Sequence, residues 1–296
     1  MNFSIWGLSG SLYTERENLL PFAQDRLHFW LDTMDRAANR FRPESELSRL
    51  NRAEGVVSLS DALVRALAAA RRASDLSDGL CDPTVLTSLE ALGYDRDYDT
   101  LTAVEDTPVE LHPSPGFAAL GFDEASRTVL KTPAWRIDLG ASAKALVADL
   151  VAEDVAPTGG VIVEIGGDVS ARGRGPDGPW VVGVAATLRI TGDEPRVTLE
   201  NGAIATSSNS VRTWRRGARV VGHIIDPRTG ASADSPFAAV TVIDVDCVSA
   251  NAFATAAHLW GEDAAWHIAQ AGRSARLVRH DGGVELVGAW PREEAQ

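Results

Sequence analysis

The chain has 296 residues, of which 45% are hydrophobic and 23% are charged, values that are ordinary for a globular protein with a sizeable core. With 28 Lys and Arg against 41 Asp and Glu, the formal net charge is −13, and a field of that sign repels polyanions and argues against nucleic acid as a partner. No basic segment leads into an apolar stretch at the N-terminus, and no later segment approaches 18 uncharged apolar residues, so we expect a cytoplasmic protein without membrane insertion.

Two amphipathic helices are predicted in the first third of the chain. Residues 17–40 and residues 59–77 both place large apolar side chains at helical spacing. Ser58 or Ser60 would cap the second helix, which should stop at Gly79. The segment between the two helices has the pattern of a loop followed by a short turn of helix.

Residues 95–117 are rich in Asp, Thr and Pro and lack periodicity, which indicates an irregular surface excursion. Beyond them strands dominate, interrupted by helices at 141–155 and 248–271, the second broken near Gly261. Helices and antiparallel strands in separate runs indicate an α+β fold. No linker splits the chain, so we expect one domain over residues 1–296. Strands are expected at 127–131, 135–139, 160–166, 180–186, 196–200, 219–226, 238–244, 275–279 and 284–288.

Two segments place a charged side chain where the chain turns. Asp82 presents a carboxylate at a corner that Pro83 makes rigid, although Asp-Pro-Thr is usually a turn or a helix cap. Asp138 ends a predicted strand before Gly140, and the free N–H groups of the following helix can hold an anion with Lys144 nearby. The alternative is an ordinary strand–turn–helix with a solvated lysine. Because a first-turn lysine is usually exposed, Lys144→Ala should weaken binding or turnover while leaving the fold intact.

A pair of glycines, Gly166 and Gly167, follows an apolar strand and directly precedes Asp168. Such a pair is most often a tight hairpin with a bulge. The alternative is a stretch of backbone that lies flat against a planar ring.

Asn251 and Thr255 are spaced at i and i+4 on a predicted helix and therefore share one face. Two oxygen ligands in that arrangement suit a hard cation such as Mg²⁺. Polar residues on a packed helix explain the pattern equally well until a group outside the helix points at them.

Taken in order, these segments resemble the ApbE family of FAD:protein FMN transferases over nearly the whole chain. Each motif is degenerate alone, but seven in register make chance similarity improbable. The matching motifs are SELSRLN (45–51), GLCDPTV (79–85), IDLGASAKALVAD (137–149), EIGGD (164–168), AIATSS (203–208), HIIDPRTG (223–230) and ANAFAT (250–255).

The resemblance implies a single α+β domain related to the T-fold, with mostly antiparallel strands, flanking helices and FAD between two halves. Lys144 and Thr255 match catalytic positions. The metal ligands would be the backbone carbonyl of Ala141 together with Asn251 and Thr255. The positions that match FAD contacts are Trp6, Phe41, Leu80, Cys81 (in place of the usual Phe), Asp82, Asp138, Lys144 and Ile225.

The sequence departs from the family pattern at three positions. Ala145 and Ser208 each replace a glycine, and Asn251 replaces the metal-binding Asp. An amide oxygen can bind a cation but brings no negative charge, so the affinity for Mg²⁺ should fall. Asn251→Asp should restore it, unless Asp244 or Asp246 already supplies the missing carboxylate.

The reaction implied by the resemblance is cleavage of the FAD diphosphate by a Thr hydroxyl of an acceptor flavoprotein. FMN becomes esterified to that Thr and AMP leaves, with Mg²⁺ stabilising the developing charge. Two alternatives remain open at this point. One is an FAD pyrophosphatase that releases FMN and AMP to water, and the other is a non-catalytic FAD-binding protein with an impaired metal site.

Overall fold

The computed structural model describes residues 1–101, 104, 107–186 and 192–291. The chain divides into two units and passes between them four times, twice within a helix, α1 (Leu20–Ala38) and α5 (Gly140–Val155). The first unit contains Met1–Trp30, Lys144–Val211 and Asp234–Gln296, and the second contains Leu31–Ala143 and Arg212–Ala233.

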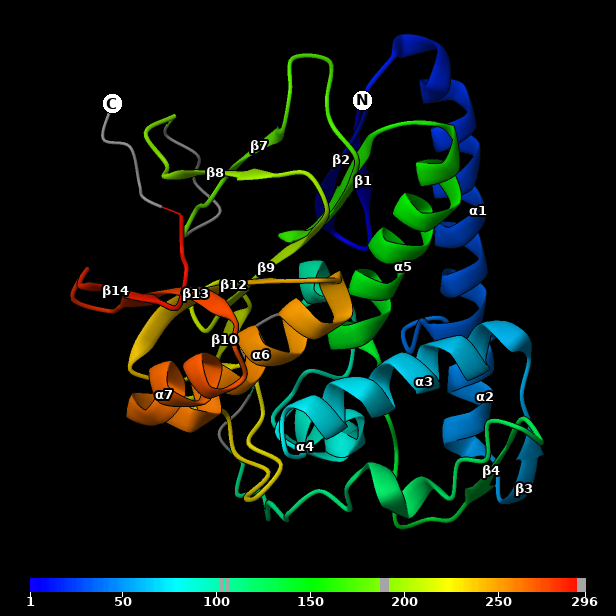
Figure 1. The fold of residues 1–296 in the computed structure, drawn as a ribbon. Coiled ribbons are helices and arrows are strands. Elements are labelled where there is room, and N and C mark those ends of the chain that lie inside the picture. Colours follow the sequence, from blue (N-terminus) through cyan, green and yellow to red (C-terminus); the bar gives the residue numbers. More distant parts are fainter. Residues whose placement is uncertain (102–103, 105–106, 187–191, 292–296) are drawn as a thin grey trace. The chain divides into compact units, whose positions relative to one another are not determined.

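The first unit is built on an eight-stranded sheet in which every neighbouring pair is antiparallel (Figure 1). Its strand order is β1-β2-β5-β6-β9-β12-β13-β14. The strands are β1 (Asn2–Ile5), β2 (Leu8–Thr14), β5 (Val161–Ile165), β6 (Asp168–Arg172), β9 (Gly202–Ser208), β12 (Phe237–Asp244), β13 (Ser274–Arg279) and β14 (Val284–Val287).

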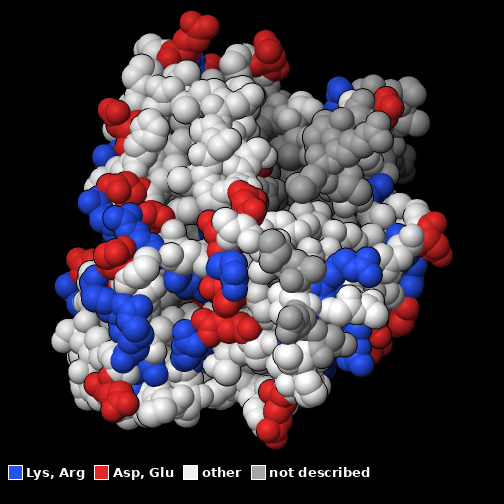
Figure 2. All heavy atoms as spheres, turned by 180° about the vertical axis from the view of Figure 1, so that it is seen from behind, with Lys and Arg blue, Asp and Glu red and all other residues white. Residues whose placement is uncertain are grey.

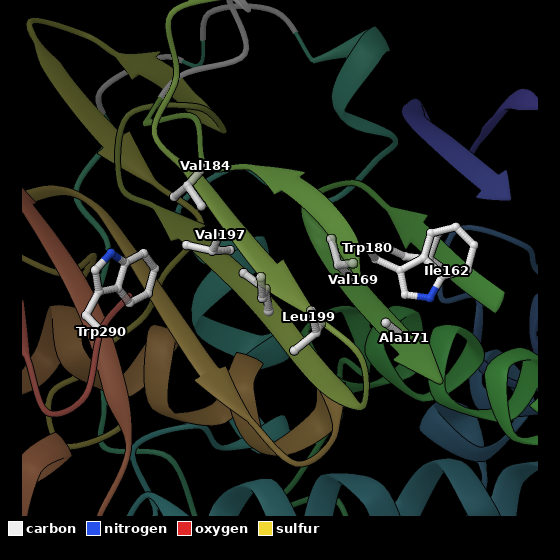
Figure 3. Close-up of a cluster of buried hydrophobic side chains, with 9 residues drawn as sticks. Ile162, Val169, Ala171, Trp180, Val184, Val197, Leu199 and Trp290 are labelled. Atoms are coloured by element: carbon white, nitrogen blue, oxygen red, sulfur yellow. The ribbon is translucent and has the colours of Figure 1, made fainter. Parts of the chain in front are cut away.

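Helices α6 (Cys247–Trp260) and α7 (Ala264–Gln270) pack on this sheet, α6 mainly on β9 and β12 (Figure 1). Side chains alternate between the two faces of a strand. Asp168 of β6 points toward α6, because its carboxylate accepts a hydrogen bond from Asn251. The next residue, Val169, therefore points to the opposite face of the sheet. Val169 belongs to an apolar cluster with residues of β7 (Trp180–Gly183) and β8 (Arg196–Leu199), so both faces of the sheet are covered (Figure 3).

The second unit contains mainly helices. They are the C-terminal part of α1 (Leu20–Ala38), α2 (Glu46–Arg52), α3 (Asp61–Leu76), α4 (Leu86–Ala91) and the first turn of α5 (Gly140–Val155). Two small sheets accompany them, β3 (Gly55–Ser58) with β4 (Thr128–Lys131) and β10 (Thr213–Arg216) with β11 (Arg219–Gly222). Short 3₁₀ turns occupy Glu17–Leu19, Pro83–Val85, Tyr98–Thr100, Phe117–Leu120, Ala156–Thr158 and Gly261–Asp263.

The helix boundaries follow the capping residues that the sequence offers. Ser60 caps α3 by accepting a hydrogen bond from the Leu63 N–H, and Gly79 closes its C-terminal turn with φ +81°. The predicted break at Gly261 is confirmed, since α6 ends at Trp260 and α7 begins at Ala264.

One predicted strand is wrong, and several strands were not predicted. Residues 135–139 form no strand, because the Asn51 side-chain amide takes the place of a neighbouring strand by pairing with both the N–H and the C=O of Ile137. The N-terminal hairpin β1–β2 and the strands β3, β6, β9 and β10 are additional to the prediction. β11 ends at Gly222, four residues earlier than expected.

Acidic and basic side chains are intermixed over the face shown in Figure 2. Among the described residues, no helix is both long enough and apolar enough to cross a membrane.

Candidate functional site

The first unit carries a polar cluster that begins at the turn between β5 and β6. Gly166 and Gly167 form a two-residue turn with φ +60° and +92°, which pairs Ile165 directly with Asp168. These backbone angles suit a tight hairpin and favour glycine. The hairpin interpretation is confirmed without the bulge, and the turn places Asp168 at the first position of β6.

Asp168 holds together side chains from two helices. Its Oδ2 lies 3.1 Å from the Nζ of Lys144 in α5, and its Oδ1 accepts a 3.0 Å hydrogen bond from the Nδ2 of Asn251 in α6. The Asp168 side chain is 1% exposed and that of Lys144 is 18% exposed. Lys144 is therefore a partner of a buried carboxylate, which corrects the interpretation of a solvated lysine.

Hydroxyl groups extend the cluster along α6. Thr255 Oγ1 donates to the Asn251 Oδ1 at 3.5 Å and lies 3.2 Å from the Ser207 Oγ of β9. Asn251 and Thr255, at i and i+4 on α6, thus each have a polar partner outside the helix. Asn251 contacts the Asp168 carboxylate, and Thr255 contacts the Ser207 hydroxyl. We refer to Lys144, Asp168, Ser207, Asn251 and Thr255 as the acid–amide cluster.

His258 lies one turn beyond Thr255 and contacts the backbone of Ser207. Its Nε2 donates to the Ser207 carbonyl oxygen at 3.1 Å, and its Nδ1 accepts from the Ser235 hydroxyl at 2.8 Å. Burial lowers the pKa of His258 to about 4, so the ring is neutral at pH 7.

The donor atoms of the acid–amide cluster suit a hard cation. Asn251 Oδ1, Thr255 Oγ1 and Ser207 Oγ are neutral oxygens, and Asp168 supplies one carboxylate beside them. No group of three or more His, Cys, Asp or Glu side chains within the described residues could hold a metal ion. A cation here would therefore depend on neutral oxygens, on Asp168 and on anionic groups of a bound ligand.

Asp244 and Asp246, the two carboxylates that could substitute for the missing one at position 251, have other partners. Asp246 caps α6 by accepting from the Ser249 N–H at 2.9 Å, and Asp244 lies 2.9 Å from the Nε of Arg273. The carboxylate that contacts Asn251 is Asp168.

A further buried carboxylate, that of Asp149 in α5, lies beside the N-terminus of α6. It accepts hydrogen bonds from the N–H groups of Cys247 and Val248 and from the Ser170 hydroxyl. Burial raises the pKa of Asp149 to about 6. Asp149 thus joins α5, β6 and α6.

The second unit carries a different arrangement, centred on Arg40 and Asp138. The Arg40 Nε donates to the Asp138 Oδ2 at 2.5 Å, and the other carboxylate oxygen accepts from the Gly140 N–H at 2.8 Å. The guanidinium carbon of Arg40 lies 4.0 Å from the ring centre of Phe41 and 4.6 Å from that of Tyr94. We refer to these four side chains as the Arg–aromatic cluster.

Ile225 is buried in the apolar core that supports the Arg–aromatic cluster, together with Tyr94 and Trp214. The rings of Tyr94 and Trp214 are 5.4 Å apart, and those of Phe41 and Tyr94 are 5.6 Å apart. The structure therefore brings Phe41, Asp138 and Ile225 into one region of the second unit.

Asp82 fulfils the helix-cap interpretation of its motif. Its Oδ1 accepts from both the N–H and the hydroxyl of Thr84, each at 2.7 Å, at the start of a 3₁₀ turn. Burial raises the pKa of Asp82, and the bonds from Thr84 oppose that shift. Leu80 and Cys81 precede it as buried residues.

The remaining candidates lie at turns. Trp6 and Gly7, with φ +52° and +68°, form the two-residue turn between β1 and β2, and Trp6 is half-buried. Ala141 is exposed in the first turn of α5.

Sequence reasoning assigned no site role to Asp168, Ser207, His258 or Arg40. Asp168 had a usable signal, because it follows the glycine pair directly. Ser207 lies within the matched motif AIATSS and Arg40 directly precedes Phe41, but nothing in their spacing indicated their partners. His258 is one turn from Thr255, a relation that becomes informative only once β9 is known to lie beside α6.

The comparisons with known proteins agree on one family. A family model described as the ApbE family matches residues 8–277. An FAD:protein FMN transferase of Chlamydia muridarum (strain MoPn / Nigg) is 31% identical over 242 residues, which cover 79% of this chain and 74% of that protein. An FAD:protein FMN transferase of Vibrio cholerae (strain O395) is 28% identical over 283 residues, covering 89% of this chain and 77% of that protein.

Solved structures show the same fold. The apo form of Pseudomonas stutzeri flavinyl transferase ApbE superposes with a TM-score of 0.80 at 24% identity, covering 98% of this chain and 94% of the other. The ApbE protein of Thermotoga maritima gives a TM-score of 0.82 at 24% identity, with coverages of 97% and 96%. The predicted α+β fold of helices and antiparallel strands is confirmed.

Proposed function

Because the chain belongs to the ApbE family, we propose that it is an FAD:protein FMN transferase that acts as one catalytic domain in the cytoplasm. The observation that carries the proposal is the acid–amide cluster. Lys144 comes from one motif, and Asn251 and Thr255 come from another. They are joined through Asp168, which contacts Lys144 and Asn251, and through Asn251, which contacts Thr255.

In the proposed reaction, a Thr hydroxyl of an acceptor flavoprotein attacks the FMN phosphorus of FAD. The new P–O bond joins FMN to the Thr oxygen, the bond to the AMP phosphate breaks, and the hydroxyl proton is released. Lys144 would lie near the diphosphate oxygens and stabilise negative charge that develops on them. This role fits a lysine held by Asp168 rather than one that swings freely in solvent.

Asn251, Thr255 and the carbonyl oxygen of Ala141 would hold Mg²⁺ in this proposal. The fit rests on the oxygen atoms of Asn251 and Thr255, which lie 3.5 Å apart. Bound Mg²⁺ would neutralise charge on the diphosphate during transfer.

The flavin and adenine portions of FAD would contact aromatic and apolar residues outside the acid–amide cluster. In the second unit, the Arg–aromatic cluster offers ring faces and an oriented carboxylate, which suit a flat heteroaromatic ring. The proposed contacts are Trp6, Phe41, Leu80, Cys81, Asp82, Asp138, Lys144 and Ile225.

The test combines purified protein, FAD and Mg²⁺ with an acceptor peptide that contains Thr, and with a matched peptide in which that Thr is Val. Covalent flavin fluorescence on the Thr peptide alone, with one AMP released per flavin attached, supports the proposal. Free FMN and AMP without labelled peptide would identify a pyrophosphatase. FAD that binds but stays intact would identify a non-catalytic flavin-binding protein.

Ligand preference provides a second test that does not depend on an acceptor. Contacts on both sides of the diphosphate predict that FAD binds more tightly than FMN. A fluorescence titration measures both affinities, and equal or tighter binding of FMN would contradict the proposed site.

A further inference from the structure

We propose that the negative charge of the metal site is carried by Asp168, which acts through the amide of Asn251. This inference rests on the proposed function, since it concerns the Mg²⁺ site at Asn251 and Thr255. It assigns to Asp168 a positioning role that the family resemblance did not provide.

The hydrogen bond between the two residues fixes which way the Asn251 amide points. An amide has a donor side and an acceptor side, whereas an ionised carboxylate only accepts. The Nδ2 of Asn251 donates to Asp168 at 3.0 Å, and the Oδ1 is consequently turned toward the hydroxyl of Thr255. The reversed amide would set two acceptor oxygens against each other, so Asp168 selects the orientation that presents oxygen to a cation.

The position of Asp168 also makes its charge effective at the cluster. The side chain is 1% exposed, so solvent screens it poorly, and its one cationic contact among the described residues is Lys144 at 3.1 Å. Lys144 is also the residue proposed to contact the diphosphate. A cation at Asn251 Oδ1 would therefore be separated from the Asp168 carboxylate only by the Asn251 amide group. Asp168 would supply the negative charge that a neutral residue 251 does not.

This arrangement changes the expectation for Asn251→Asp. A carboxylate at position 251 would place an oxygen about 3 Å from the Asp168 oxygen, where an N–H now donates. Two carboxylates so close cannot both remain ionised without a cation between them. The single substitution thus adds repulsion rather than simply restoring a ligand.

The exchanged double variant D168N/N251D separates these effects. It retains one carboxylate and one amide in contact, and it keeps the total charge and nearly the same side-chain volumes. Only the location of the charge differs, because the carboxylate now lies on α6 beside Thr255.

The experiment measures the affinity for Mg²⁺ in the presence of FAD by isothermal titration calorimetry, with Mn²⁺ binding followed by electron paramagnetic resonance as a second probe. Four proteins are compared: wild type, D168N, N251D and D168N/N251D. We expect D168N to weaken Mg²⁺ binding at least tenfold, N251D to bind no more tightly than wild type, and the exchanged variant to bind at least as tightly as wild type. The matched control is D246N, which replaces a carboxylate that caps α6 and should leave the affinity unchanged.

Thermal melting of each protein shows whether it is folded. If D168N fails to fold because Lys144 loses its partner, the exchanged variant carries the same loss, and the comparison of N251D with wild type decides, since both retain Asp168 beside Lys144. An N251D variant that binds Mg²⁺ tenfold more tightly than wild type would overturn the proposal, as would equal losses in D168N and D246N.

The failure of this inference differs from the failure of the proposed function. Mg²⁺-dependent flavin transfer by the wild type, with an unshifted Mg²⁺ midpoint in folded D168N, would remove only the role of Asp168. A wild type that binds no Mg²⁺ with FAD would overturn both.

Discussion

The two polar clusters each contain an acid–base pair, yet the burial of the partners is reversed. In the acid–amide cluster the acid Asp168 is 1% exposed and its base Lys144 is 18% exposed. In the Arg–aromatic cluster the base Arg40 is 6% exposed and the acid Asp138 is 19% exposed. The more accessible member is the cation in the first cluster and the carboxylate in the second.

The surroundings of each pair explain what it can bind. Amide and hydroxyl oxygens surround Asp168 and Lys144, and an accessible cation suits a phosphate. Aromatic rings flank Arg40, and an accessible carboxylate suits a hydrogen-bond donor on a ring edge or a sugar. An ion pair by itself therefore says little about which ligand a site binds. The neutral groups around the pair are more informative.

The largest expected effect is the loss of stability in Lys144→Met. Removing the base leaves the buried Asp168 carboxylate without its cation, and breaking a buried pair in this way costs about 3 kcal/mol. The chain's only other lysine, Lys131, offers a matched control. It is buried against the Trp135 ring and forms no salt bridge among the described residues, so Lys131→Met should cost about 1 kcal/mol or less.

Urea unfolding of both lysine variants at pH 7 measures the difference. Equal losses of stability in the two variants would show that the Asp168 carboxylate does not depend on Lys144. The acid–amide cluster would then not contain the buried ion pair on which the comparison of the two clusters rests.

A smaller effect is expected when the accessible acid of the second cluster is removed. Asp138→Ala takes the carboxylate from Arg40, but the guanidinium retains its contacts with the rings of Phe41 and Tyr94. We expect a loss of about 2 kcal/mol in the free energy of unfolding, together with weaker FAD binding.

A double-mutant cycle with Arg40→Met isolates the contribution of this pair. Removing both partners should cost less than the sum of the single losses, because no charge is left buried alone. Additive losses would show that Asp138 and Arg40 act independently, and unchanged FAD affinity in folded Asp138→Ala would remove Asp138 from the proposed contacts.

The sequence predicts the parts of this protein that depend on local order. Ser60 and Gly261 mark helix boundaries because capping and left-handed turns are decided within a few residues. The segment 135–139 has an equally strandlike pattern but pairs with the Asn51 side chain. Its failure as a strand prediction follows from a partner distant in sequence, which periodicity does not reveal.

The same limit applies to the candidate sites. Motif spacing identified Lys144, Asn251 and Thr255, but Asp168, the partner of Lys144 and Asn251, emerges only from the antiparallel pairing of β5 with β6 and the packing of α6. Whether a lysine is solvated or paired depends on such tertiary contacts, since a position near the start of a helix allows both.

The smallest predicted effect concerns pH and would sharpen the description of the first cluster. The folded pKa of His258 is about 4, below the ordinary value of 6.5, so the unfolded chain takes up a proton before the folded protein does. The stability due to neutral His258 is fully present above pH 6.5 and is lost as the pH falls toward 4. Asp149 acts in the opposite sense, because its folded pKa of about 6 lies above its ordinary 3.8, and the folded protein takes up that proton first.

Between pH 6 and pH 4 these two contributions oppose each other. From pH 7 to pH 5.5, His258 should lower the free energy of unfolding by about 1 kcal/mol, and Asp149 should return most of that amount. The wild type should therefore show a nearly flat profile over this range, whereas His258→Gln should become more stable as the pH falls and Asp149→Asn should become less stable. Urea unfolding at pH 7.0, 6.0 and 5.5 measures all three profiles. Parallel profiles for the wild type and His258→Gln would mean that His258 titrates normally in the folded protein, and its position between Ser207 and Ser235 would then not be the dry, neutral support of the acid–amide cluster that the structure describes.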